Sequence, residues 1–187
     1  MTEQQSTQQT PLSYEGILEL FRQTDLKIQE VARLSKETEK KISDLGSRIG
    51  EIVEHMVAGN IVAKFQAFGY QVTDCSRNKT FKNEELGFSG EIDLLLEDGD
   101  IAILIEVKTT LVVSDVRKHI VRLEKYRQHI DSKGNGVKRR FIGAVAGAVV
   151  KDDAVKFAWK KGMYVIVQSG EAVEIIPPPE GFVAKEW

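Results

Sequence analysis

Apolar residues recur at alternating steps of three and four along residues 14–56. Ten of the thirteen positions in this series are apolar or aromatic. The series is Tyr14, Ile17, Phe21, Thr24, Ile28, Val31, Ser35, Thr38, Ile42, Leu45, Ile49, Ile52 and Met56. So narrow a seam is typical of helices that pack on one another, so we predict a coiled-coil oligomerisation helix over residues 14–49. The alternative is a long solvated helix folded back on its own domain, and the oligomer number does not follow from the pattern.

The apolar face of this helix widens from Gly50 onward, which indicates that the helix changes partner and packs on its own domain. We expect it to end near Gly69, a residue type that favours helix termination. The polar, Gln-rich residues 1–13 predict a disordered tail. Three consecutive prolines from Pro177 stop regular structure. The domains predicted are therefore a folded domain over 50–176 and a C-terminal tail over 177–187.

The rest of the chain alternates strand and helix patterns. Strands are expected over 70–76, 91–96, 101–109, 140–150, 163–168 and 172–176, and residues 77–89 are expected to form a polar connection. Helices are expected over 114–130, with Ser114 as N-cap, and from Asp152 or Asp153 to Gly162. This order predicts an α/β fold with a mixed sheet flanked by helices.

Composition narrows the class of protein. The chain has 187 residues, of which 42% are hydrophobic, and no run approaches the ~20 apolar residues of a membrane span. The single cysteine and the polar start favour a cytoplasmic protein with no membrane partner. A net charge of −2 argues against a generic nucleic-acid-coating protein. Charge is nevertheless segregated, with a balance of −6 over residues 81–110 and +6 over 111–140.

Charged residues also gather at one end of a predicted hairpin. If Asp98 and Gly99 form a two-residue turn, Asp93 lies opposite Leu104 and Glu91 opposite Glu106. One face then carries the charged residues, and the other is uniformly apolar. The charged face holds Glu91, Asp93, Glu106 and Lys108, and the apolar face holds Ile92, Leu94, Leu96, Ile101, Ile103, Ile105 and Val107. Either the charged residues face water, or a divalent cation gathers them; oxygen ligands suit Mg²⁺.

The segment Gly90-Glu91-Ile92-Asp93, followed after twelve residues by Glu106-Val107-Lys108, resembles the PD-(D/E)XK nuclease motif. The similarity is to the restriction-endonuclease-like and Holliday-junction-resolvase-like branch. An upstream helical glutamate of such proteins matches Glu54, with Glu51 as the fallback. The residues before Asp93 depart from the motif, since no proline precedes it. The chain is also similar to uncharacterised bacterial proteins that join a coiled coil to this domain.

The resemblance implies a restriction-endonuclease-like fold and a Mg²⁺-dependent DNA endonuclease, with Mn²⁺ as a possible substitute. It implies that Asp93, Glu106 and the Val107 carbonyl hold the metal and that Glu54 binds the metal's water or a second ion. Lys108 would orient the attacking water. Because each site cuts one strand, an oligomer would bring two sites to one duplex. The alternative is a catalytically inactive module that binds nucleic acid or protein on a coiled-coil scaffold.

Basic residues follow the motif. Lys118, Arg122, Lys125 and His129 form a stripe along the predicted helix, and Lys138, Arg139 and Arg140 come after it. We expect Lys118, Arg122, Lys125, Arg139 and Arg140 to bind DNA phosphates; the alternative is an ordinary solvated helix face. The three histidines lack metal-ligand spacing and are expected at the surface or in the core.

Overall fold

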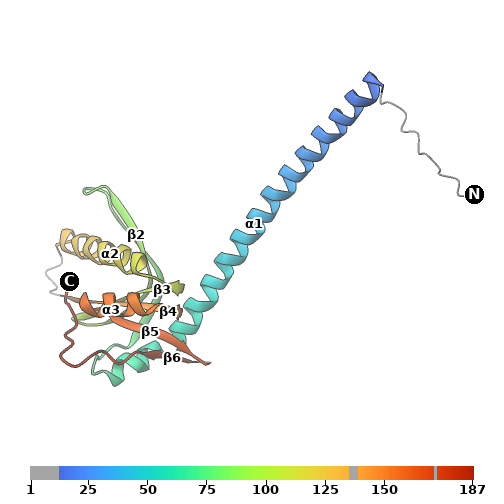
Figure 1. The fold of residues 1–187 in the computed structure, drawn as a ribbon. Helices are drawn as coiled ribbons and strands as arrows, with labels where there is room; N and C mark the ends of the chain where they lie inside the picture. The colour runs from blue at the N-terminus through green and yellow to red at the C-terminus, as the bar shows by residue number, and fades with distance from the viewer. Residues whose placement is uncertain (1–12, 135–138, 171) are drawn as a thin grey trace, which may run out of the picture. The chain divides into compact units, whose positions relative to one another are not determined.

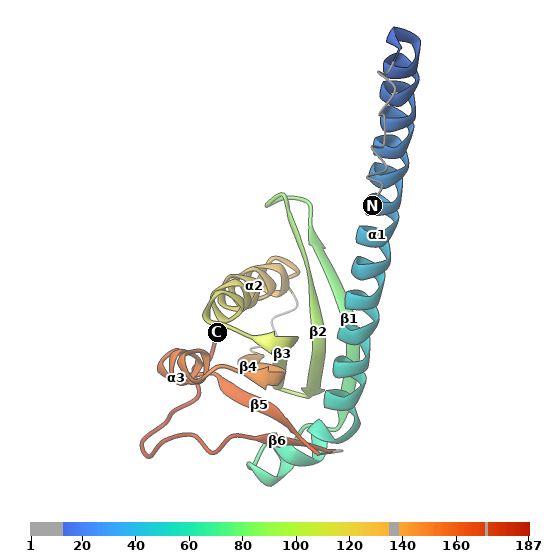
Figure 2. The same ribbon diagram turned by 45° about the vertical axis from the view of Figure 1, so that its right-hand side comes forward.

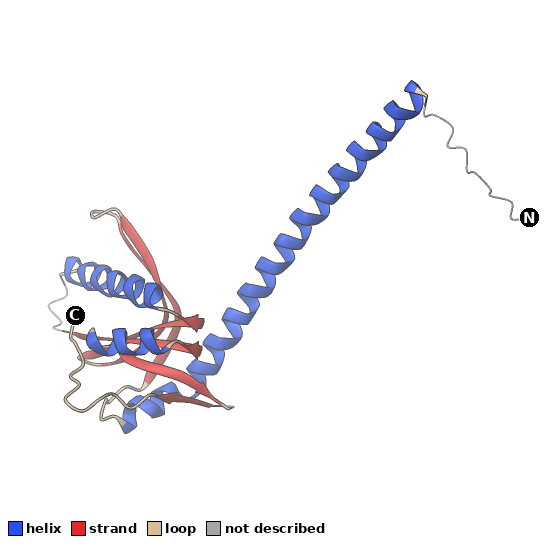
Figure 3. Cartoon of the chain, in the orientation of Figure 1, coloured by secondary structure: helices blue, strands red, loops and turns tan. Residues whose placement is uncertain are grey.

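The computed structural model of the chain describes residues 13–134, 139–170 and 172–187. Its elements are α1 (Tyr14–Ala67), β1 (Asp74–Asn83), β2 (Phe88–Asp98), β3 (Ile101–Leu111), α2 (Val113–Ser132), β4 (Arg140–Val150), α3 (Asp152–Lys160), β5 (Tyr164–Ser169) and β6 (Ala172–Ile175). This order confirms the predicted alternation of helices and strands (Figure 1; Figure 3). Residues 1–12 of the predicted tail, and Lys138, lie outside the described residues. Within the described ranges, no helix has the length and apolar character needed to cross a bilayer.

Helix α1 has a defined cap at each end. Ser13 Oγ accepts a hydrogen bond from the Gly16 N–H at 3.1 Å, which satisfies one of the free donors of the first turn. After Ala67 the chain turns through Gly69, whose φ of 90° favours glycine, and the N–H of Tyr70 donates to the Phe65 carbonyl at 3.1 Å. The helix therefore ends where the sequence predicted.

The chain divides into two compact units, Met1–Gly46 and Ser47–Trp187. In the first unit the apolar seam residues of α1 are exposed, so no apolar partner covers them among the residues that the structure describes. The exposed seam residues include Tyr14, Ile17, Phe21, Ile28, Val31, Ile42 and Leu45.

The second unit contains one six-stranded sheet in the order β1-β2-β3-β4-β5-β6. The first three strands form an antiparallel meander, β3, β4 and β5 run parallel, and β6 returns antiparallel to β5. This is the mixed sheet that the sequence predicted. Near the chain end, Glu186 forms an antiparallel bridge with Ile142, and the Trp187 N–H donates to the Phe141 carbonyl at 3.0 Å.

Apolar cores lie on both faces of the sheet. The final turns of α1 cover one face with Val53, Val57, Ile61 and Phe65, all of which are buried. Helices α2 and α3 cover the other face, where Leu123 and Ala158 are among the buried residues (Figure 2). Since full burial of a large apolar side chain contributes roughly 1.5–3 kcal/mol, these faces fix the sheet between its helices.

The first strand and the β2–β3 register differ from the prediction. Strand β1 begins at Asp74 rather than at residue 70 and extends through most of the predicted polar connection. It reads as polar because it is an edge strand on which Phe81 and Asn83 alone are buried. Asp98 pairs with Ile101, so the turn is Gly99-Asp100 rather than Asp98-Gly99. The predicted register was wrong by two residues; since two is the strand period, most side chains keep their predicted face.

Both predicted helix caps are also wrong. Val112 is the N-cap of α2, and its N–H donates to Oδ2 of Asp115 at 3.2 Å, so Ser114 lies inside the first turn. Lys151 is the N-cap of α3, which leaves Asp152 and Asp153 in the first turn. Acidic residues there interact favourably with the helix dipole without capping the helix themselves.

Candidate active site

The alternation of side chains between the two faces of the sheet is interrupted in strand β2 at Asp93. Leu94 and Leu96 pack in the core beneath α1, whereas Ile92, also even-numbered, packs in the core beneath α2. The apolar face predicted to include Ile92 is therefore not continuous. On the paired strand, the register runs from Arg77 with Leu94 to Lys79 with Ile92, which leaves Asn78 at the level of Asp93. Asn78 has a φ of 52°, a left-handed conformation that is unusual for a residue other than glycine.

Strands β2 and β3 stop pairing beside Asp93. The pairs between the two strands end at Leu94 with Ile105. Asp93 comes directly before Leu94, and the N–H of Val107, two residues after Ile105, donates to Oδ2 of Asp93 at 2.8 Å. The Asp93 carboxylate thus accepts a hydrogen bond from a backbone N–H that would otherwise donate to a backbone carbonyl of β2. This bond anchors the Asp93 side chain to β3.

The Lys108 ammonium lies among three of the oxygens predicted to hold a metal. Its Nζ is 2.6 Å from Oε1 of Glu106, 3.7 Å from Oδ2 of Asp93 and 3.0 Å from the Val107 carbonyl oxygen. These three oxygens come from the middle of two neighbouring strands, β2 and β3, and surround one positive charge. The structure therefore brings Asp93, Glu106, Val107 and Lys108 together.

Glu106 is a buried charge, with its side chain only 2% exposed. Oε1 pairs with Lys108, and Oε2 forms an ion pair with Nη1 of Arg122 from α2. Arg122, which the sequence placed with the phosphate-binding residues, is thus turned toward Glu106. Two cations compensate the carboxylate, as a buried charge requires.

His119 completes the wall behind Glu106. Its ring is fully buried, with Nε2 3.1 Å from the Leu104 carbonyl oxygen and Nδ1 3.8 Å from Oε2 of Glu106. Burial lowers the pKa of His119 to about 4, so the ring is neutral near pH 7. Since the carbonyl can only accept, Nε2 carries the proton, and His119 adds no positive charge beside Glu106.

Glu54 reaches the same region from α1. Burial raises the pKa of its carboxyl, the negative charge of Asp93 raises it further, and the positive charge of Lys108 opposes both. Glu91 and Glu51 act in the same direction as Asp93 with smaller effect. Glu54 also lines a cavity together with Asn78, the residue of β1 that lies at the level of Asp93.

The donor set agrees with a small divalent cation in its chemistry. It offers carboxylate and carbonyl oxygens that already converge on one cation, the Lys108 ammonium. Across the described residues, no three acidic, histidine or cysteine side chains form a ready-made metal cluster. Mg²⁺ needs fewer protein ligands than that, since it is usually bound by one or two carboxylates with waters and phosphate oxygens.

The other predicted phosphate-binding residues are dispersed. Lys118 is exposed on α2, and Nζ of Lys125 lies 5.8 Å from the centre of the Phe88 ring. Arg139 forms an ion pair with Glu97, and its Nε donates to the Gly99 carbonyl at 3.0 Å. The structure does not bring these residues to Asp93.

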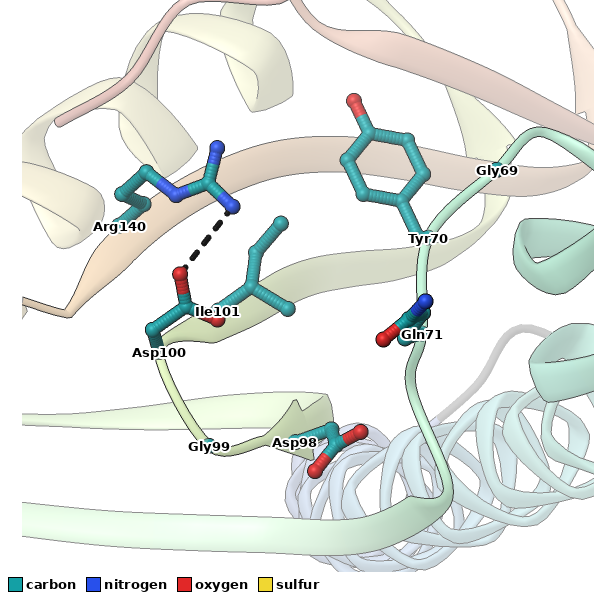
Figure 4. Close-up of a pocket in the computed structure, with 8 residues that line it drawn as sticks. All are labelled: Gly69, Tyr70, Gln71, Asp98, Gly99, Asp100, Ile101 and Arg140. Carbon is teal, nitrogen blue, oxygen red and sulfur yellow. Dashed lines mark hydrogen bonds and ion pairs between the residues drawn. The ribbon is translucent and has the colours of Figure 1, made fainter.

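Arg140 belongs to a separate cavity of about 420 Å³ at the β2–β3 turn. The cavity is lined by Gly69, Tyr70, Gln71, Asp98, Gly99, Asp100, Ile101 and Arg140. Arg140 pairs with Asp100 at 3.3 Å across it (Figure 4). Arg140 is level with Ile101 in the parallel β3–β4 register, whereas Glu106 is level with Val145. Five residues of strand, about 16 Å, therefore separate this cavity from Glu106.

Sequence reasoning missed the partners of Glu106 on α2. His119 and Arg122 are three residues apart, so they lie on one side of a helix, and Val116 and Leu123 mark that side as the buried one. An arginine beside a buried helix face was the available signal that Arg122 faces inward. No pattern pointed to Asn78, because the kink depends on how two strands pair.

No protein-family model and no curated protein matches the chain. Its structure is similar to a repair endonuclease from Pyrococcus abyssi, with 16% identity, 67% of this chain and 47% of that chain covered, and a TM-score of 0.38. It is also similar to the protein of unknown function AF1548 (15% identity, 70% and 62% covered, TM-score 0.37). A third similar structure is EndoMS in complex with double-stranded DNA (15% identity, 63% and 45% covered, TM-score 0.31). The chain spans less than half the length of the two endonucleases, and at these identities and TM-scores the similarity assigns no function to it.

Proposed function

We propose that the chain is a divalent-metal-dependent DNA endonuclease whose site is formed by Asp93, Glu106, Lys108 and Glu54. The observation that carries this proposal is the convergence of oxygens from Asp93, Glu106 and Val107 on the Lys108 ammonium. Three oxygen acceptors around one positive charge, two of them from carboxylates, form a candidate cation site midway along β2 and β3. Burial of a carboxylate such as Glu106 is costly, which marks this point of the sheet as a candidate functional site.

In this proposal Asp93, Glu106 and the Val107 carbonyl would hold Mg²⁺ or Mn²⁺, and Glu54 would hold a water of the ion. When bound, the ion supplies polarisation of the phosphoryl oxygen and lowers the pKa of its water. The side chain of Lys108 is 38% exposed, so its ammonium can donate to the attacking water and stabilise the developing negative charge. Val107 fixes Asp93 through its 2.8 Å hydrogen bond, and Arg122 fixes Glu106, which keeps both carboxylates in place before the substrate arrives.

The direct test is cleavage of supercoiled and linear DNA by wild type, Asp93→Asn and Lys108→Met. We expect Mg²⁺-dependent cleavage by wild type, abolished by EDTA, and at least about 100-fold slower cleavage by each variant. Lys156→Met is the matched control, because Lys156 is an exposed lysine on α3. Equal cleavage by wild type and both site variants, or none by wild type, contradicts the proposal.

A second candidate is a catalytically inactive module that binds nucleic acid or protein. It is favoured by one observation: both oxygens of Glu106 already pair with cations of the chain itself. In that case the cluster is a structural ion network. DNA binding would then persist in EDTA, and no cleavage would be detected with either Mg²⁺ or Mn²⁺.

We also propose that residues 14–49 associate with other copies of the chain. Apolar side chains at heptad positions are exposed along this part of α1, with Ile28 60% and Ile42 64% exposed.

A further inference from the structure

A cavity of about 470 Å³ adjoins Glu54 and is not used by the proposed chemistry. It is lined by Glu51, Glu54, His55, Arg77 and Asn78. Two of these residues link it to the site already described. The charge of Asp93 raises the pKa of the Glu54 carboxyl and the charge of Lys108 lowers it. Asn78 lies at the level of Asp93 in the register of β1 and β2.

The Arg77 guanidinium has donors to spare. Its Nη1 lies 2.6 Å from Nδ1 and 2.8 Å from Nε2 of His55. The guanidinium only donates, so the ring nitrogen that accepts carries no proton. Among the described residues no ion pair of Arg77 is found, although Glu51 and Glu54 line the same cavity. An exposed arginine with five donors, only one of whose nitrogens contacts the His55 ring, is free to bind an anion bidentately.

Arg77 lies directly before a kink in β1, the left-handed residue Asn78. Asn78 follows it with a φ of 52°, which costs an L residue roughly 1–2 kcal/mol. Beyond the kink the edge strand continues with exposed Lys79 and Lys82. Strand β1 thus carries three basic residues against the single acid Asp74. The cavity is the point where this basic edge meets the carboxylates.

We propose that Arg77, supported by His55, binds a phosphate of the DNA strand next to the phosphodiester held at Asp93. This inference rests on the proposed function, because it takes the reacting phosphate to lie at Asp93 and Lys108. Acids at the scissile bond need a cation nearby to hold the polyanion in register, and the residues on α2 and at the β2–β3 turn do not supply it beside Glu54. Phosphate contacts of this kind position a strand without reading its sequence.

The test is the binding of a fluorescein-labelled duplex to wild type, Arg77→Gln and Lys156→Gln, measured by anisotropy in EDTA over a range of KCl concentrations. We expect Arg77→Gln to raise the Kd about 5- to 10-fold and to lower the slope of log K against log [KCl] by about 0.9, the effect of one lost phosphate contact. Lys156→Gln, with its lysine on α3, is expected to stay within about twofold of wild type in Kd. His55→Ala is expected to weaken binding less than Arg77→Gln, since it removes only the support. Unchanged thermal melting verifies that each variant is folded.

The outcomes separate this site from the nuclease proposal. If Arg77→Gln binds DNA with the Kd and salt slope of wild type, the phosphate site is wrong, whether or not wild type cleaves. If Arg77→Gln weakens binding while wild type does not cleave in Mg²⁺, the phosphate site stands and the nuclease proposal fails. If wild type binds no DNA, both fail.

Discussion

The backbone N–H of Val107 donates to the Asp93 carboxylate at 2.8 Å, just beyond Leu94 and Ile105, the last pair between their strands. The motif residues are therefore linked directly, through the backbone of one and the side chain of the other. This bond needs β2 to leave β3 at Asp93, and that departure coincides with the left-handed residue Asn78 on β1. A distortion of the sheet edge, rather than a regular hairpin, places the acids at one point.

The first prediction concerns the buried pair of Glu106 and Arg122. Arg122→Met removes one of the two cations that pair with Glu106 and leaves Lys108. We therefore expect the free energy of unfolding to fall by about 2–3 kcal/mol. Urea unfolding measures this. The exposed Lys118→Met on the same helix is the control and should change stability by less than about 0.5 kcal/mol.

A double-mutant cycle makes the assignment specific. Adding Glu106→Gln to Arg122→Met should cost less than the sum of the two single changes, because the uncompensated charge is then gone. Additive costs would show that the two side chains do not interact.

The second prediction concerns Asn78. Asn78→Gly should leave stability nearly unchanged, since glycine adopts a φ of 52° without strain, whereas Asn78→Val should cost about 1–2 kcal/mol. Both are measured by urea unfolding. A valine variant as stable as the glycine variant would mean that the left-handed conformation at this position is dispensable.

The third prediction is a pH dependence of stability. The pKa of His119 is lowered from 6.5 to about 4 by burial, so the unfolded chain binds the proton more readily than the folded one. This stabilising contribution is complete above pH 6.5 and is lost as the pH falls toward about 4; it is on the order of 3 kcal/mol.

Unfolding free energies measured from about pH 7 to pH 5 should therefore decline in wild type, with a shallower decline in His119→Gln, which can still donate to the Leu104 carbonyl. His129 also has a lowered pKa, through burial first and Lys133 second, so some decline should remain in the variant. Identical pH profiles would exclude His119 as a source of the effect.

The fourth prediction concerns the seam of α1. Ile28→Glu should weaken self-association, because it places a charge at a heptad position. Leu26→Glu should not, because Leu26 lies outside the heptad series. The two residues are similarly exposed, 60% and 53%, so they form a matched pair. Analytical ultracentrifugation reports the molar mass of each variant; equal masses for both, or a monomeric wild type, would contradict a coiled coil.

Local patterns in the sequence predicted most of the fold. The apolar run of β4 and the helix end at Gly69 were placed correctly, because each depends on residues near in sequence. The β2–β3 register was wrong by two residues, since Asp98-Gly99 and Gly99-Asp100 are both acceptable turns and only packing selects between them. Strand β1 was misplaced because an exposed edge strand lacks the apolar alternation that marks a strand.

The sequence predicted which residues form the candidate site, but not which of their side chains form ion pairs with one another. Asp93, Glu106 and Lys108 follow from the motif, and the structure brings them together. The inward turn of Arg122 did not follow, because a stripe of basic residues on a helix looks the same whether one member points to solvent or to a buried glutamate. The kink at Asn78 depends on two strands at once and leaves no periodic signal in either.

The most direct measurement of the central claim is a calorimetric titration of the chain with Mn²⁺, comparing wild type with Asp93→Asn. Since Asp93 and Glu106 are taken to share one cation, we expect saturable binding by wild type and no measurable binding by Asp93→Asn at unchanged thermal melting. The same heats from both proteins, or no heat from wild type, would mean that the oxygens around Lys108 bind the lysine ammonium and no metal ion.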